Sequence, residues 1–256
     1  MRGLIKYFLF LLTLTMQAQM DKVKEGVYRW SELPVVSAEN KETRVILEGV
    51  SPHFEYLEIH ATTQLPGAIP NPPNANDAIE ECIIVKEGLM KVTINGKSQI
   101  VGPESVILFM PKELHAIENA GDSNLTYYVL SYKSKKTINI ERAQAHGGSV
   151  VYNAEALEFK PSVRGGGIAY FDRGTSMCER FEMHITQLNK IGASHNPHKH
   201  IETEIMLVIS GNTEMTIDGK DYYGTTGDLF FVNSELMHGI RNAGNKPCKY
   251  FAFKWF

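Results

Sequence analysis

Residues 192–211 read GASHNPHKHIETEIMLVISG, and this stretch holds the densest group of potential metal ligands in the chain. His198 and His200 are two residues apart, so an extended backbone projects both imidazoles from the same side. Glu204 keeps the same parity, and a bend after His200 would let its carboxylate meet the two rings. The apolar run 205–209, ended by Ser-Gly, is typical of a buried strand. The stretch therefore predicts a β-protein with three metal ligands beside one strand.

A second stretch supplies a fourth ligand. Residues 227–242 read GDLFFVNSELMHGIRN, in which an apolar strand and a short polar turn lead to His238. Three imidazoles and one carboxylate suit a first-row divalent metal, and an octahedral ion with four protein ligands keeps two positions for water or substrate. The predicted cofactor is a divalent transition metal, and manganese, iron, nickel, zinc and copper all accept such ligands.

The two stretches together show the spacing G-x5-H-x-H-x3-E-x6-G and G-x5-N-x4-H-x3-N, which resembles the two motifs of the cupin superfamily. Asn233 and Glu235 stand where the second motif usually has Pro and Gly, a departure that affects a turn and no ligand. The resemblance implies a small antiparallel jelly-roll barrel with a metal at its mouth. It carries over the ligands residue by residue: His198, His200, Glu204 and His238.

The chain also repeats itself. Residues 88–130 and 211–253 align without a gap, so that GLMKVTINGK faces GNTEMTIDGK. Short apolar runs punctuated by turns such as Asn95-Gly96 favour an all-β fold, and a repeat this long indicates a duplicated domain. We therefore predict a bicupin, two tandem jelly-roll β-barrels, with an N-terminal cupin domain at 20–145 and a C-terminal cupin domain at 146–256.

The first copy lacks half of the ligand set. Asn74 and Asn76 stand where the second copy has His198 and His200. Neutral amide oxygens are poor ligands for the metals that imidazole selects, so the sequence predicts a degenerate first site without metal. One alternative stays open, a weak oxygen-ligand site formed by Asn76, Asp77, Glu81 and His115.

Some polar residues occur only in the second copy and are candidates for its site. Arg180 and Gln187 are expected on the same strand as Glu182 and His184, and we take them as candidate catalytic residues. His195, Tyr250 and Lys254 are expected at the surface or rim. By contrast, a Glu-x-His pair occurs in both copies, at 58–60 and 182–184, which favours a structural hydrogen-bonding role. The aromatic residues of the last strand are expected in the core: Phe251, Phe253 and Trp255.

The first 19 residues form a separate region. Two basic residues, Arg2 and Lys6, lie at the start of an apolar run that ends near Met16. Ala18 offers a small residue for cleavage. This pattern predicts a signal peptide at 1–19 and an exported protein, periplasmic or secreted, with no membrane attachment after cleavage. The cysteines form no disulfide framework and are expected to be buried, with a Cys178–Cys248 bond as the minor alternative; the three are Cys82, Cys178 and Cys248.

The composition excludes some partners and leaves others. Hydrophobic content of 43%, charged content of 21% and a net charge of −3 give no basic surface for nucleic acid. A divalent ion with one carboxylate ligand favours a small oxygen-rich partner, such as a sugar acid, hydroxy acid or ureide. An enzyme using Lewis-acid or oxygenase chemistry (isomerase, hydrolase or oxygenase) is the first hypothesis. A non-catalytic small-ligand or sugar-binding module and a metal-stabilised structural protein stay open, as do a monomer and a homodimer.

Overall fold

The computed structural model describes residues 20–256, and these are almost entirely β-structure. The predicted signal peptide at 1–19 lies outside the described residues. Within the described range, no helix is long and apolar enough to cross a membrane. The all-β prediction is confirmed. The helical segments are short: η1 (Trp30–Glu32), α1 (Ile140–Ala145) and η2 (Ala154–Ala156).

The first copy forms a barrel from a seven-stranded sheet, ordered β11-β8-β5-β10-β4-β3-β2, and a three-stranded sheet, ordered β7-β6-β9. All neighbouring strands in the two sheets are antiparallel, as a jelly roll requires. The strands of this copy are β2 (Val36–Ala38), β3 (Lys41–Gly49), β4 (Phe54–Gln64), β5 (Glu80–Glu87), β6 (Met90–Ile94), β7 (Lys97–Val101), β8 (Val106–Phe109), β9 (His115–Asn119) and β10 (Leu125–Ser134).

The second copy repeats this arrangement. Its seven-stranded sheet has the order β1-β19-β16-β21-β14-β13-β12, and a four-stranded sheet has the order β15-β20-β17-β18. The predicted duplication into two jelly-roll barrels is confirmed. The strands are β12 (Lys160–Ser162), β13 (Gly165–Arg173), β14 (Phe181–Leu188), β15 (Gly192–Ala193), β16 (Thr203–Ser210), β17 (Thr213–Ile217), β18 (Lys220–Gly224), β19 (Leu229–Val232), β20 (His238–Asn242) and β21 (Cys248–Trp255).

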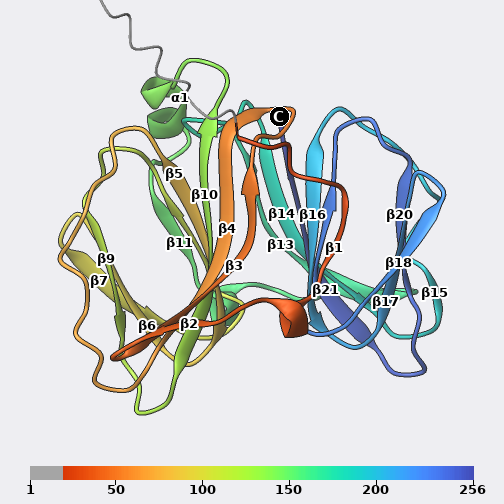
Figure 1. Cartoon of the computed structure of the whole chain (residues 1–256), viewed down its shortest axis with the longest axis horizontal. Helices are drawn as coiled ribbons and strands as arrows, with labels where there is room; N and C mark the ends of the chain where they lie inside the picture. Colours follow the sequence, from red (N-terminus) through yellow and green to blue (C-terminus); the bar gives the residue numbers. More distant parts are fainter. Residues whose placement is uncertain (1–19) are drawn as a thin grey trace, which may run out of the picture.

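The two barrels exchange one strand each. β1 (Gly26–Tyr28) precedes the first copy but pairs with β19 of the second, and β11 (Val150–Tyr152) pairs with β8 of the first (Figure 1). These short strands occupy matching places in the repeat. The domain boundary near residue 145 stays a sequence-based prediction. In the structure, each seven-stranded sheet ends on a strand that belongs to the other sequence copy.

The barrels stand side by side, and one large apolar cluster joins them (Figure 1). The Phe54 ring of the first copy stacks on Trp255 of the second, with ring centroids 5.2 Å apart. Two further clusters fill the separate barrels. The expected core aromatics of β21 are confirmed, because Phe251, Phe253 and Trp255 are each only 1% exposed. All three cysteines are buried and unbonded, as expected.

Candidate metal centre

Backbone pairing places the predicted histidines next to one another. His198 lies in the loop before β16, and its backbone N–H and C=O both bond to His238 at the start of β20, at 2.9 and 2.8 Å. The backbone N–H of Glu235 donates to the carbonyl of His200 at 2.8 Å. Glu235 has φ 65°, in the left-handed region where glycine is usual. The turn therefore accepts a glutamate while still delivering His238.

The four predicted ligands converge. One nitrogen from each of His198, His200 and His238 lies within 4.8 Å of the others. The chain bends after His200, as expected, and Glu204 on β16 then places its Oε2 3.0 Å from His200 Nε2 and 2.9 Å from His238 Nε2. His238 and Glu204 are only 1% and 5% exposed. The two strand residues of the group are thus buried in the barrel, and the two loop histidines are partly exposed.

The hydrogen bonds of the rings test whether a cation fits. The Nδ1 of His238 lies 2.8 Å from the Leu236 carbonyl, and the Nδ1 of His200 lies 3.2 Å from the Glu202 carbonyl. A neutral ring that donates from Nδ1 directs an Nε2 lone pair at the same carboxylate oxygen of Glu204. Lone pairs that meet a carboxylate repel it unless protons or a cation lie between them. This donor set fits a divalent transition metal.

The charges of the group agree with that conclusion. Burial and the neighbouring imidazoles lower the pKa of His198, and its buried Nδ1 has no hydrogen-bond partner among the described residues. Burial raises the pKa of the Glu204 carboxyl, but hydrogen bonds to His200 and His238 outweigh burial and lower it to about 2. Metal binding requires an ionised carboxylate and neutral imidazole. Near neutral pH, Glu204 is ionised and His198 is neutral, as required.

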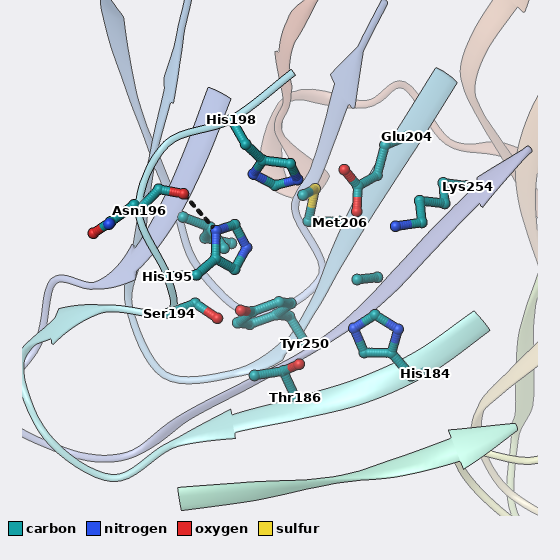
Figure 2. A pocket seen from close by; sticks show the side chains of 12 residues that line it. His184, Thr186, Ser194, His195, Asn196, His198, Glu204, Met206, Tyr250 and Lys254 are labelled. Atoms are coloured by element: carbon teal, nitrogen blue, oxygen red, sulfur yellow. Dashed lines mark hydrogen bonds between the residues drawn. The ribbon is translucent and has the colours of Figure 1, made fainter. Parts of the chain in front are cut away.

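A cavity of about 460 Å³ opens beside His198 and Glu204 (Figure 2). Its wall carries a cation, Lys254 of β21, whose Nζ lies 3.5 Å from Glu182 Oε2. The Nδ1 of His184 lies 3.4 Å from the other oxygen of Glu182. The remaining lining residues are Thr186, Ser194, His195, Asn196, Met206, Ile240, Tyr250 and Ala252. The site thus combines the candidate metal ligands with hydroxyl, imidazole and ammonium groups.

Three residues expected at the surface or rim line this cavity, and two of them face its interior. Tyr250 is only 2% exposed, and Lys254 faces inward from the strand position opposite Glu204. The surface expectation was wrong for Tyr250 and Lys254, because cross-strand pairing with β16 and β14 turns their face of β21 into the barrel. His195 is exposed, as expected, and lies at the cavity mouth, with Nδ1 2.9 Å from the Asn196 carbonyl.

The two candidate catalytic residues lie outside the cavity lining. Arg180, just before β14, is held by three carboxylates, those of Asp172, Glu182 and Glu202, at 2.8, 2.7 and 3.0 Å. Gln187 donates to Asn189 from the exposed side of the chain. Their catalytic role stays a sequence-based prediction. In the structure, Arg180 orients Glu202, whose backbone carbonyl and side chain face His200.

The sequence analysis gave His184 a structural hydrogen-bonding role and did not select Thr186 as a site residue. Both lie on β14 with the parity of Glu182, and this face points into the barrel. The signal that could have found them is the alternation E-x-H-x-T, repeated in the first copy as Glu58-x-His60-x-Thr62. Alternate residues of a barrel strand share the interior face, so the repeat marks a cavity wall as well as a structural pair.

The first copy has a different arrangement at the matching positions. Asn76 Oδ1 accepts hydrogen bonds from the backbone N–H groups of Ala78 and Ile79, at 2.9 and 3.0 Å, and so closes a turn. Glu81 and His115 remain as a pair, 3.4 Å apart. Within residues 20–256, only the group of His198, His200 and His238 brings three or more histidine, cysteine or acidic side chains close enough to hold a metal ion.

Comparisons with known proteins agree with this architecture. The family model described as the cupin domain matches twice, at residues 62–131 and 186–254. No curated protein sequence matches the chain. Solved structures share the fold at low identity. Protein Ylba from E. coli is similar with a TM-score of 0.69 and 17% identity, covering 91% of this chain and 93% of its own.

Two other structures are similar over comparable lengths. The oxalate decarboxylase of Lactobacillus farciminis, solved as a formate complex, gives a TM-score of 0.68 at 13% identity, covering 93% of this chain and 88% of its own. AerE from Microcystis aeruginosa gives a TM-score of 0.67 at 10% identity, and the match covers 88% of this chain and 97% of AerE. At these identities the likeness shows the fold alone. Together with the two family matches and the two barrels, it establishes that this chain belongs to the cupin family, as a duplicated cupin with its histidine triad in the C-terminal copy.

Proposed function

We propose that this chain is an exported, metal-dependent cupin enzyme that acts on a small, oxygen-rich carboxylic acid in the C-terminal barrel. One observation carries the proposal. Three imidazoles and a buried carboxylate converge beside a cavity of about 460 Å³ whose wall carries an ammonium group, that of Lys254. A site for a cation and a site for an anion then lie in one cavity.

The four ligands would hold a divalent transition metal: His198, His200, Glu204 and His238. A bound ion of this kind supplies Lewis-acid polarisation of a substrate oxygen, or a site for dioxygen beside a chelated substrate. The protein fixes the ligands in advance, because the Nδ1 atoms of His200 and His238 donate to backbone carbonyls. Such bonds set the ring orientation and the tautomer.

The cavity wall supports binding of an acid. Lys254 faces the cavity, and its one acidic neighbour within 4 Å among the described residues is Glu182 at 3.5 Å, a distance that leaves the ammonium able to bind a substrate carboxylate. Burial raises the pKa of Tyr250, so its hydroxyl stays protonated as a hydrogen-bond donor. Lys254 would form an ion pair with the substrate carboxylate, and Tyr250 and Thr186 would form hydrogen bonds with the other substrate oxygens.

His184 is placed to move a proton. Its Nδ1 faces Glu182 at 3.4 Å, and the ring lies in the cavity wall (Figure 2). A carboxylate behind one nitrogen holds the imidazole in place and leaves Nε2 for the substrate. Sugar acids, hydroxy acids and ureides with a carboxylate fit this arrangement. The oxalate decarboxylase that shares the fold is named for a reaction of a small acid, which supports the class.

Metal analysis combined with a substrate panel tests the proposal. We expect about one transition-metal ion per wild-type chain and at least a tenfold loss of metal in His198→Ala, since an imidazole ligand is removed. Asn74→Ala, at the matching position of the first copy, should keep the metal. Lys254→Ser should keep the metal and raise KM for carboxylate substrates about tenfold, because a charge-assisted hydrogen bond is lost.

The outcomes separate the hypotheses. Wild-type protein that stays free of transition metal after incubation with manganese, iron, nickel, zinc or copper would overturn the proposal. Metal-dependent binding of an acid without any product would instead identify a small-ligand binding module. For export, the mass of the protein recovered from its native host should correspond to cleavage near residue 19, and an intact N-terminus would contradict that part.

A further inference from the structure

The N-terminal barrel contains its own cavity, of about 200 Å³, which has no role in the proposed metal chemistry. Strands β3, β4, β5, β9 and β10 and the loop at 71–74 contribute to its lining. The positions match those around the C-terminal cavity, so His60 stands for His184 and Tyr127 for Tyr250. The duplicated barrel has therefore kept a cavity in the copy that has lost two histidine ligands.

Each carboxylate beside this cavity lies next to an imidazole. Glu81 lies 3.4 Å from His115 Nε2 and accepts a hydrogen bond from Ser131 at 3.1 Å. His60 lies 3.1 Å from Glu58. Lys41 is the remaining charged lining residue, and it is exposed at the rim. Ser131 occupies the position of Lys254 in the second copy, so the cation that faces the C-terminal cavity has no counterpart here.

A buried amide in the wall lacks a partner. Gln64 is 6% exposed and lines the cavity, and its Nε2 donates to the Tyr127 hydroxyl at 3.2 Å. Its Oε1 has no hydrogen-bond partner among residues 20–256. The second copy has an apolar residue, Leu188, at this position. An unsatisfied buried polar group is destabilising. The oxygen has almost no accessible surface, so a ligand hydroxyl in the cavity would reach it after a turn of the Gln64 side chain.

We propose that the N-terminal cavity binds a small, uncharged, polyhydroxylated molecule of monosaccharide size, without metal. Hydroxyl groups both donate and accept, and they match the Gln64 oxygen, the Asn74 amide and the Glu81–His115 pair. An anion would find Lys41 only at the exposed rim, and a cation would compete with His115 for Glu81. Burying an unpaired charge is far less favourable than burying hydroxyls that are hydrogen-bonded.

Calorimetric titration of the full chain with D-glucose, D-galactose, D-mannose and myo-inositol, each beside D-glucuronate, tests this inference. We expect at least one neutral compound to bind with a Kd below about 10 mM and to do so equally after metal removal with EDTA. Gln64→Leu, which installs the residue of the second copy, should weaken that binding about tenfold, as expected for one buried hydrogen bond. Lys254→Ser should leave it unchanged within about twofold.

Metal content and circular dichroism of Gln64→Leu show whether the variant is folded, and Gln64→Asn provides a smaller change that shortens the side chain. The inference is overturned if no neutral compound binds, if D-glucuronate binds the N-terminal barrel more tightly than D-glucose, or if binding survives Gln64→Leu but is lost in Lys254→Ser. Failure here leaves the proposed metal chemistry intact, because that proposal is tested by metal content and by Lys254.

Discussion

The two cavities of this protein are made from equivalent strand positions but differ in the loops that precede β5 in the first copy and β16 in the second. On the strands, Glu81 and His115 match Glu204 and His238, and both pairs keep a carboxylate beside an imidazole. In the loop, Asn76 closes a turn with its side chain, whereas His200 points at the carboxylate.

The comparison distinguishes strand residues, which both copies have kept, from loop residues, which differ between the copies. Strand residues are held by ladder bonds and by packing on both sides, so substituting them affects the core. Loop residues can change without moving the barrel. A cupin copy can therefore exchange a site of three histidines for a polar cavity by changing its loop, while the Glu–His pair persists.

The largest expected effect comes from removing the strand histidine in each copy. His238→Ala should lower transition-metal affinity more than a hundredfold, because it removes one of four ligands and leaves Glu204 without its buried partner. His115→Ala, its matched control, should leave the metal stoichiometry unchanged. Metal analysis after dialysis against a chelator of known affinity checks both. Equal losses in the two variants would show that both barrels hold metal.

A second effect concerns the contact between the barrels. Glu80 is fully buried, accepts from the Tyr132 hydroxyl at 2.6 Å and from the Met177 backbone N–H at 3.1 Å, and so joins the two copies. Glu80→Ala should lower the free energy of unfolding by about 3 kcal/mol, because it leaves two buried donors unsatisfied.

The second copy has Thr203 at the position of Glu80, and the Thr203 hydroxyl has no partner among the described residues. Thr203→Val should therefore change the free energy of unfolding by less than about 0.5 kcal/mol. Urea denaturation of the two variants measures the contrast. A loss of stability as large in Thr203→Val as in Glu80→Ala would contradict a special role for the carboxylate.

The smallest effect is a pH dependence that distinguishes the two Glu-x-His pairs. The hydrogen bond to His184 lowers the pKa of Glu182 to about 2, from an ordinary value of 4.5, with burial opposing and Lys254 adding to the shift. Because the folded-state pKa is depressed, the ionised carboxylate stabilises the fold above about pH 4.5. That stabilisation is lost as the pH falls toward about 2.

Glu182→Gln should remove about 1 kcal/mol at pH 7, after allowance for solvent screening, and almost nothing at pH 2. A hydrogen bond to His60 also lowers the pKa of Glu58, but Ser131 replaces the lysine, so Glu58→Gln should have the smaller effect. Urea midpoints at pH 7, 4 and 2 test this. A constant difference across that range would refute the linkage.

Much of the fold and of the candidate site was predictable from local spacing. The parity of His198, His200 and Glu204, and the repeat at a fixed offset, are properties of the chain alone. The structure brings those side chains together with His238, as the motif spacing indicated. Sequence reasoning placed Tyr250 and Lys254 at the surface or rim and missed the cavity role of His184, because local spacing does not show which faces of β14 and β21 line a cavity.

The sequence by itself therefore determined the duplication, the all-β class and the choice of four candidate ligand residues, since each depends on residue type and short-range periodicity. Only the tertiary structure decided the exchange of β1 and β11 between barrels and the composition of the cavity walls. Those features depend on which distant strands pair and in what register, and a one-residue change of register would turn Lys254 out of the cavity while leaving the local pattern the same.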